Sequence, residues 1–242
     1  KASINRKTTV RTTSSTPAED PFGHGQSPRA VAVSMSLNIV ICDSENHCVR
    51  IYCQYTGFLK LTFGGRGVEE GRLWYPSAVA IDLGRTNNII VSDSGNDRIQ
   101  IFSSEGKFLR ALYGFNEPRG ISVNRAGYIF VADRGNERIV VLDCHGNPAN
   151  KIDCGRHKLH SPIDVQVSHS QEEIYVINEK SRSISVFSIE GEFQEKICLY
   201  KRGDAPSSEC HVDPVCVAAT RDGGLAVVDG TTDEVLLFHE RR

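Results

Sequence analysis

The chain has 242 residues, of which 28 are Lys or Arg and 30 are Asp or Glu, so its formal charge at pH 7 is −2. This balance excludes a broadly basic protein that binds polyanions without specificity, although one basic face remains compatible with it. No apolar stretch approaches the roughly 20 residues of a membrane-spanning helix, and none has the layout of a signal peptide, so we expect no membrane contact.

Residues 1–21 differ from the rest of the chain in being rich in Ser, Thr and Lys. From residue 22 onward one pattern recurs five times: a proline, a short apolar run, and a second apolar run that closes on Asp or Asn. We therefore expect an N-terminal segment, 1–21, followed by one repeat domain, 22–242. The repeat prolines are Pro28, Pro76, Pro118, Pro162 and Pro214, and the closing residues are Asp43, Asp93, Asp133, Asn178 and Asp229.

The repeats begin 42 to 52 residues apart, and a period in the forties built from short strands is typical of a β-propeller. The second repeat shows the four strands of one blade most clearly. In Arg98–Phe102 polar and apolar residues alternate with period two, as in a half-buried strand. The four expected strands are 78–81, 88–93, 98–102 and 108–112, with a hairpin turn at 104–107.

The fifth repeat ends after its third expected strand, Val235–Phe238. A closed ring leaves no exposed sheet edge, so a strand from elsewhere has to complete this blade. The segment Ile4–Thr12, which contains the β-branched run Thr8–Thr12, is the candidate, with a disordered linker over residues 1–20 as the alternative. The sequence thus predicts an all-β fold: a propeller of four-stranded antiparallel blades, closed by an N-terminal strand. Five repeats are counted, and a six-bladed ring stays open.

Each closing Asp precedes a short polar link such as Ser94–Asp97. Asp and Asn side chains in such links bond the backbone amides of the turn, which favours a structural role. The alternative is a calcium or catalytic carboxylate cluster, but recurrence in every blade argues against a single active site. Among the starts of the first strands only Asp164 is acidic, and one carboxylate makes no metal site. We therefore expect no enzyme, no metal and no cofactor.

Eight cysteines are present without any CxxC or Cys/His ligand spacing. Cys42, Cys198 and Cys216 lie inside apolar strand runs, where a thiol behaves as a small hydrophobic group. We therefore expect reduced, buried cysteines in an intracellular, cytoplasmic protein. A secreted form with one or two disulfides is the alternative.

Segments such as Val91–Phe102 and Val131–Ile139, together with the linker Phe63–Pro76, resemble the NHL repeat. The resemblance covers residues 22–242 and weakens in repeats four and five, where Asn178 replaces Asp. A disc of this kind is most similar to the C-terminal domain of the TRIM-NHL family. That resemblance implies a propeller, usually of six blades, whose electropositive face commonly binds single-stranded or hairpin RNA and in some members binds proteins. No RING or B-box cysteine pattern is present, so ubiquitin-ligase activity would lie outside this chain.

The links between blades and those between second and third strands share one face of a propeller. Cations with interleaved aromatic residues on such a face suit a single-stranded nucleic acid, because cations hold phosphates and aromatic rings stack on bases. Trp74 and Tyr75 have an alternative role as packing between blades. The expected RNA-binding residues are Arg29, Arg66, Arg72, Trp74, Tyr75, Phe115, Arg119, Arg134, Arg156, His157, Lys158, Lys180 and Arg182.

We therefore expect the RNA-binding domain of a post-transcriptional regulator that recognises short single-stranded RNA on this face, with U-rich strands as a candidate. The alternative is a platform that docks proteins on the same face, which the near-neutral charge and the acidic residues of these links also fit. The expected partners are single-stranded RNA and the proteins of a regulatory complex. The domain itself is expected to be a monomer.

Overall fold

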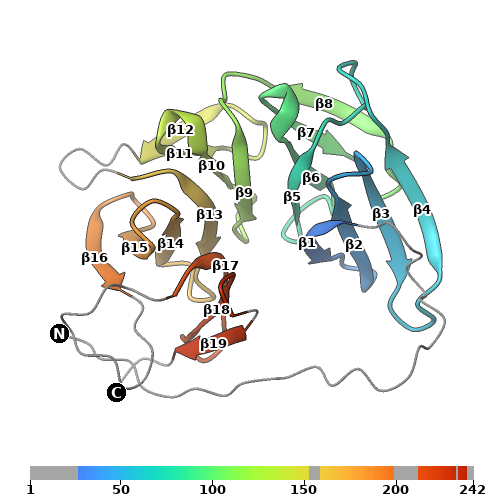
Figure 1. The fold of residues 1–242 in the computed structure, drawn as a ribbon. Coiled ribbons are helices and arrows are strands. Elements are labelled where there is room, and N and C mark those ends of the chain that lie inside the picture. The colour runs from blue at the N-terminus through green and yellow to red at the C-terminus, as the bar shows by residue number, and fades with distance from the viewer. Residues whose placement is uncertain (1–26, 153–158, 199–211, 233, 239–242) are drawn as a thin grey trace.

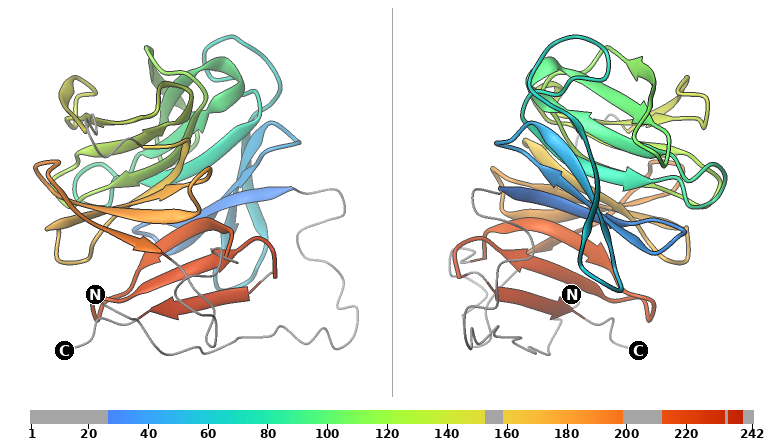
Figure 2. Two further views of the ribbon diagram at one scale, coloured as in Figure 1. Left: turned by 60° about the vertical axis from the view of Figure 1, so that its left-hand side comes forward. Right: turned by 90° about the vertical axis from the view of Figure 1, so that its right-hand side faces the viewer.

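The computed structural model describes residues 27–152, 159–198, 212–232 and 234–238. In these residues the strands form five antiparallel sheets around a common centre, so the predicted all-β propeller is confirmed (Figure 1). Four sheets have four strands and the fifth has three. Figure 2 shows the twist of these sheets, which are the blades, from two further sides.

The blades follow one another in chain order, and each begins with its innermost strand (Figure 1). Blade 1 consists of β1 (Pro28–Val33), β2 (Asn38–Asp43), β3 (Cys48–Cys53) and β4 (Leu59–Gly64). Blade 2 consists of β5 (Pro76–Ile81), β6 (Ile89–Asp93), β7 (Arg98–Phe102) and β8 (Phe108–Leu112). Blade 3 consists of β9 (Pro118–Val123), β10 (Ile129–Asp133), β11 (Arg138–Leu142) and β12 (Pro148–Ile152).

The last two blades continue the pattern, and two single-turn 3-10 helices lie in the links of blades 2 and 3. Blade 4 consists of β13 (Pro162–Val167), β14 (Glu173–Asn178), β15 (Ser183–Ser188) and β16 (Phe193–Cys198). Blade 5 consists of β17 (Pro214–Ala219), β18 (Leu225–Asp229) and β19 (Glu234–Phe238). The 3-10 helices are η1 (Ser94–Asn96) and η2 (Arg134–Asn136). The strand expected to complete blade 5, from Thr8–Thr12, lies outside the described residues.

The recurring proline and Asp are opposite ends of one strand pair. Pro76 pairs with Asp93, and Ala78 then pairs with Ser92, so Ser77 is an extra residue in a β-bulge. The same bulge follows the proline in blade 1, where the extra residue is Arg29. A bulge bends the strand and changes the direction of a side chain. The proline-to-Asp spacing of the sequence is therefore the register of the first two strands.

The closing Asp holds the link that enters its own blade. The buried Asp93 carboxylate accepts hydrogen bonds from the Trp74 backbone amide at 2.7 Å, Asn96 at 2.9 Å and Arg98 at 2.7 Å. Asp133 makes the corresponding bonds in blade 3, to the Asn116 amide, Asn136 and Arg138. These carboxylates are structural as predicted, but the backbone amides that they bond belong to the link before the first strand and not to the turn after the second.

The core lies between the blades, where the apolar side of one sheet packs against the next. In one cluster Val40 and Val49 of blade 1 pack with Val79 and Val91 of blade 2. Blades 2, 3 and 4 are each covered on both faces in this way, because each lies between two other blades. Apolar residues on both faces of a strand are therefore required, as in other sheets that are buried on both sides.

The described cysteines, six of the eight, are free thiols. Cys42 is buried as expected, and Cys48 is buried as well. The expectation of burial is wrong for Cys198 and Cys216, which are exposed. Cys198 lies on the outer strand of blade 4, and Cys216 lies on the inner strand of blade 5, where its thiol is hydrogen-bonded to Asp164 of blade 4.

Candidate nucleic-acid interface

The link between β4 and β5, residues 65–75, forms a compact loop against blade 2. The Leu73 amide donates to the Gly65 carbonyl at 2.9 Å, and Arg66 forms an isolated β-bridge with Leu73, whose side chain is buried. Gly64 and Gly65 have φ values of +96° and +86°, a backbone conformation that other residues rarely adopt. The buried leucine and the two glycines thus bring Arg66 close to the residues that precede Pro76.

Arg66 lies over the Trp74 ring, with its guanidinium carbon 5.6 Å from the ring centroid, which is a cation–π contact. The Trp74 backbone is fixed from both sides, because its amide donates to Asp93 and its carbonyl accepts from the Gly95 amide at 2.8 Å. The indole is half-buried. The structure thereby presents an aromatic ring and a cation as a unit held by the blade.

Tyr75 stands beside this pair and is 52% exposed, so it does not fill the seam between the blades. Its backbone amide donates to Nδ1 of His47 at 3.0 Å, and the two rings meet edge to face with centroids 4.5 Å apart. His47 is a residue of the site that the sequence reasoning missed. The sequence does contain a signal for this position: His47 follows Asp43 by four positions, as Asp97 follows Asp93 and Glu137 follows Asp133. In the structure the three residues share a positive φ, of +54°, +52° and +50°. We call His47, Arg66, Arg72, Trp74 and Tyr75 the linker platform.

Arg72 completes the linker platform by donating from its guanidinium to the Gly64 carbonyl at 3.1 Å while remaining exposed. Among the residues that the structure describes, Arg29, Arg66 and Arg72 form no salt bridge. Arg29 is exposed at the bulge of β1. These three cations are therefore available to an anionic ligand.

His47 is held neutral in this setting. Burial lowers its pKa below the ordinary 6.5, and the nearby Arg66 cation lowers it further. The geometry also requires a neutral ring, because Nδ1 of His47 accepts a hydrogen bond from the Tyr75 backbone amide. A protonated ring carries a hydrogen on both nitrogens and could not accept this bond.

Acidification should therefore destabilise the fold through His47. Below pH 6.5 the unfolded chain binds a proton at this residue more readily than the folded chain does, so the stability present above pH 6.5 is lost as the pH falls through the lower folded pKa. His47→Asn keeps an acceptor for Tyr75 and removes the titration. Urea unfolding at pH 7.5 and 5.5 should show a smaller loss of stability in His47→Asn than in the unchanged protein. Equal losses in both would contradict this role of His47.

A second group of predicted cations is already paired with carboxylates. Arg134 bridges Glu117 at 2.6 Å and Glu179 at 2.8 Å, and Arg119 donates to Glu117 at 2.5 Å. Burial would raise the pKa of Glu117, but the hydrogen bonds from Arg119 and Arg134 lower it overall. The hydrogen bond to Glu179 contributes most to the raised pKa of Arg134. Only the Arg134–Glu179 pair joins two blades, because Glu117 lies two residues before Arg119 in the link that enters the blade of Arg134.

The remaining predicted residues do not gather at the linker platform. Phe115 is half-buried and packs against the core between blades 2 and 3. Lys180 is exposed and lies 3.6 Å from a Glu137 oxygen, and Arg182 lies 3.9 Å from an Asp213 oxygen. Arg156, His157 and Lys158 lie outside the described residues.

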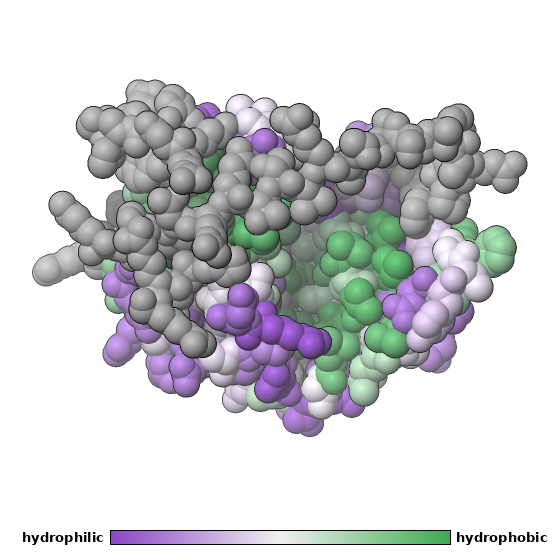
Figure 3. Space-filling model, turned by 90° about the horizontal axis from the view of Figure 1, so that it is seen from below, coloured by the Kyte–Doolittle hydropathy of each residue, from purple (hydrophilic) through white to green (hydrophobic). Residues whose placement is uncertain are grey.

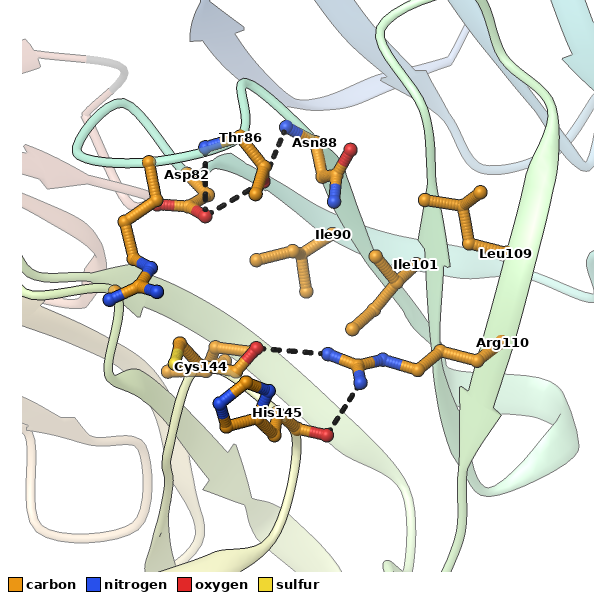
Figure 4. A pocket seen from close by; sticks show the side chains of 12 residues that line it. Asp82, Thr86, Asn88, Ile90, Ile101, Leu109, Arg110, Cys144 and His145 are labelled. Carbon is orange, nitrogen blue, oxygen red and sulfur yellow. Dashed lines mark hydrogen bonds between the residues drawn. The ribbon is translucent and has the colours of Figure 1, made fainter.

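A cavity of about 300 Å³ lies at the opposite end of blades 2 and 3, among the hairpins (Figure 4). Its polar groups largely bond one another: Arg110 donates to the carbonyls of Cys144 and His145, and Asp82 accepts from Thr86. None of the predicted RNA-binding residues lines it. The cavity is therefore separate from the linker platform.

Asp164, the one acidic residue among the strand starts, has a structural role. Its carboxylate accepts the amides of Val165 at 3.0 Å and of Val217, in the next blade, at 2.9 Å. Burial raises its pKa to about 6. In the described part of the chain His, Cys, Asp and Glu form no group of three able to hold a metal ion, and no helix has the length and apolarity to cross a membrane.

Comparison with known proteins finds the same repeats that the sequence shows. The sequence model of the NHL repeat matches residues 26–52 and 115–142. The Protein brain tumor of Drosophila melanogaster is 30% identical over 137 residues, which are 56% of this chain. The match spans only 13% of that protein.

Solved structures share the fold at low sequence identity. A streptogramin B lyase superposes with a TM-score of 0.66 at 17% identity, covering 89% of this chain and 69% of that chain. The WD40 propeller domain of Doa1 superposes with a TM-score of 0.70 at 12% sequence identity, covering 92% of this chain and 67% of that chain. A chain of the nidogen/laminin complex superposes with a TM-score of 0.67 at 16% sequence identity, covering 88% of this chain and 80% of that chain. At these identities the likeness shows the fold alone.

Proposed function

We propose that this chain, a β-propeller built of NHL repeats, binds short single-stranded RNA on the linker platform and acts as the RNA-binding part of a post-transcriptional regulator. The observation that carries the proposal is the Arg66–Trp74 pair beside the exposed Tyr75 ring. Aromatic faces stack on unpaired bases and cations hold the phosphates, which is the combination that single strands need. The TRIM-NHL resemblance of the repeats supports the same ligand.

The arginines that form salt bridges and those that do not lie on different parts of the predicted RNA-binding face, and this difference restricts where RNA is expected to bind. Arg119 and Arg134 already neutralise Glu117 and Glu179, so a phosphate would have to compete with these carboxylates. The unpaired cations Arg29, Arg66 and Arg72 lie on blade 1 and on the link to blade 2. We therefore propose that the strand is held chiefly over blades 1 and 2.

Charge reversal tests this placement. Fluorescence-anisotropy titration of labelled U-rich and A-rich oligomers should give binding at micromolar concentration or tighter. Arg66→Glu should weaken it about tenfold or more, because a phosphate contact is replaced by repulsion. Binding through three cations should give a slope of log K against log salt of about −2, since a single strand contributes about 0.7 per contact.

Arg221→Glu is the matched control, because Arg221 is an exposed arginine in the β17–β18 hairpin at the opposite end of the blades. This control should bind as the unchanged protein does. Equal losses in the two variants would remove the linker platform as the site. No RNA binding at tens of micromolar would favour the alternative, a protein-docking face.

A further inference from the structure

The cavity between blades 2 and 3 is lined by a buried carboxylate that is only partly bonded. Asp82 lines the cavity and is 8% exposed. Its Oδ2 accepts a hydrogen bond from the Thr86 hydroxyl at 2.8 Å, but among the described residues no group donates to its Oδ1. A buried oxygen without a donor costs free energy, so this cavity favours a ligand that carries an N–H or O–H group.

Blade 2 alone has a carboxylate at this position, directly after the inner strand. In the other blades the side chain at this position is neutral and can still hold the hairpin: the Ser34 hydroxyl accepts the Asn38 amide, and the Asn124 side chain accepts the Tyr128 amide. A hydroxyl or an amide is therefore sufficient for the hairpin, and the second oxygen of Asp82 has no part in it. The residues at this position are Ser34, Asp82, Asn124, Ser168 and Thr220.

The hairpin that carries Asp82 is also longer than its counterparts, and it packs closely against blade 3. A side chain on Gly84 would collide with the Arg125 backbone, and one on Gly127 would lie 2.7 Å from Cδ of Arg85. This packing brings Arg85 to the cavity. The hairpin spans residues 82–88, whereas the other blades connect their first two strands by residues 34–37, 124–128, 168–172 and 220–224.

The inner wall of the cavity is apolar. Ile90, Ile101 and Ile129 line it, and Figure 4 shows Ile90 and Ile101 between Asp82 and Arg110. These three residues are buried, unlike the hydrophobic side chains that Figure 3 shows from below in a hollow on the other side of the molecule. The volume of about 300 Å³ is at the lower end of the range for ligand sites. The cavity therefore fits one large side chain or a small molecule with an apolar body.

Cations surround this cavity without carboxylate partners. Arg85 and Arg125 are exposed, and in the described parts of the chain neither forms a salt bridge. Arg110 donates to the carbonyls of Cys144 and His145, which do not neutralise its charge. Repulsion by these guanidinium groups disfavours an ammonium group in the cavity. It favours a neutral donor inside and anionic groups at the rim.

We propose that this cavity binds a tyrosine side chain in an acidic segment of a partner protein. The phenol ring packs on the isoleucines and its hydroxyl donates to Asp82, while acidic residues beside the tyrosine pair with Arg85 and Arg125. A tyrosine combines an apolar ring with one polar donor, and such side chains are common anchors of protein interfaces. The proposal is independent of RNA binding at the linker platform, which lies at the other end of the blades.

Cys144 reports whether the cavity is occupied, because it lines the cavity and is a half-buried free thiol. p-Cresol, which is the tyrosine side chain as a free molecule, should slow the alkylation of Cys144 by N-ethylmaleimide when it is added at millimolar concentration. Cys198, on the outer strand of blade 4, should react at an unchanged rate and serves as the internal control. Mass spectrometry of the alkylated peptides separates the two sites.

A labelled pentapeptide with a central tyrosine between acidic residues tests the class of ligand in an anisotropy titration. Replacing its tyrosine by phenylalanine should weaken binding about tenfold or more, because a hydrogen bond to a charged acceptor is lost. Asp82→Ser introduces the residue that blades 1 and 4 have at this position, and this variant should bind the two peptides equally. Arg85→Glu should weaken the tyrosine peptide several-fold, whereas the control Arg221→Glu, in the corresponding hairpin of blade 5, should not.

Three results would overturn the proposal. Unchanged alkylation of Cys144 at millimolar p-cresol would show that the cavity does not take the ring. Tighter binding of a peptide with lysines in place of the acidic residues would reverse the charge assigned to the ligand. Protection of Cys144 by a U-rich oligomer, but not by the tyrosine peptide, would assign the cavity to nucleic acid.

The comparison of the two peptides in the unchanged protein still decides if Asp82→Ser fails to fold. Equal affinity for the tyrosine and phenylalanine peptides would exclude a hydrogen bond from the hydroxyl to Asp82. A loss of affinity with phenylalanine, together with protection of Cys144 by the tyrosine peptide, is the expected result.

Discussion

Asp93→Ala should lower the free energy of unfolding by about 3–5 kcal/mol, because it leaves a buried arginine without its countercharge. The Asp93 carboxylate is fully buried and lies 2.7 Å from Nε of Arg98, whose side chain is only 5% exposed. Arg98 also donates to the carbonyls of Val68, Glu69 and Arg72, so it cannot turn toward water without breaking the link between blades 1 and 2. The measurement is urea unfolding at neutral pH.

Asp43→Ala is the matched comparison in blade 1. Asp43 is equally buried, but its partner Arg50 is 23% exposed on its side chain and can be hydrated when the carboxylate is removed. The loss of stability should therefore be smaller than in Asp93→Ala. A change below about 1 kcal/mol in Asp93→Ala, the range of a surface ion pair, would show that the buried pair does not hold the blade.

Trp74→Ala and Tyr75→Ala should each weaken the binding of a short single-stranded RNA by roughly 5- to 150-fold. Stacking on an aromatic ring contributes about 1–3 kcal/mol per base, and both rings belong to the linker platform. Trp74→Ala also removes the ring over which Arg66 lies. Anisotropy titration with a U-rich oligomer measures the effect, and the urea midpoint of each variant shows whether the fold is retained.

Tyr55→Ala is the control for the aromatic variants. Tyr55 is an exposed tyrosine in the β3–β4 hairpin, at the end of blade 1 opposite the linker platform. Its removal should leave RNA binding unchanged. Comparable losses in Tyr55→Ala and Tyr75→Ala would mean that the RNA does not distinguish the two ends of the blades.

The repeat unit was predictable from the sequence because local chemistry determines it. The proline and the Asp of each repeat form a register pair, as Pro76 and Asp93 do, so their spacing reports the length of one hairpin. Gly106 in the β7–β8 hairpin has φ of +74°, as its place in a tight turn requires. Arg98 and Arg138 hold the closing carboxylates, which follows from their fixed distance along the chain.

The candidate site was only partly predictable, because its neighbours come from different blades. Trp74 and Tyr75 were identified from the linker, but the contact between Tyr75 and His47 joins residues 28 positions apart. The Arg134–Glu179 pair likewise joins blade 3 to blade 4, so it removes a cation that seemed available from the sequence.

The exposure of the inner strand of blade 1 could not be predicted either. Val31 and Val33 have the same apolar character as Val79 and Ile81, and only the position of blade 1 in space leaves them exposed. Cys216 was likewise expected to be buried because of its apolar strand, and its exposure depends on the place of that strand in blade 5.

Photo-crosslinking of a U-rich oligomer that contains 4-thiouridine, followed by mass-spectrometric mapping of the crosslinked peptides, tests the RNA interface most directly. The linker platform predicts crosslinks to Trp74 and Tyr75, and their loss when unlabelled oligomer is added in excess. Crosslinks confined to the hairpins at the opposite end of the blades, or none at saturating protein, would contradict RNA binding at this site.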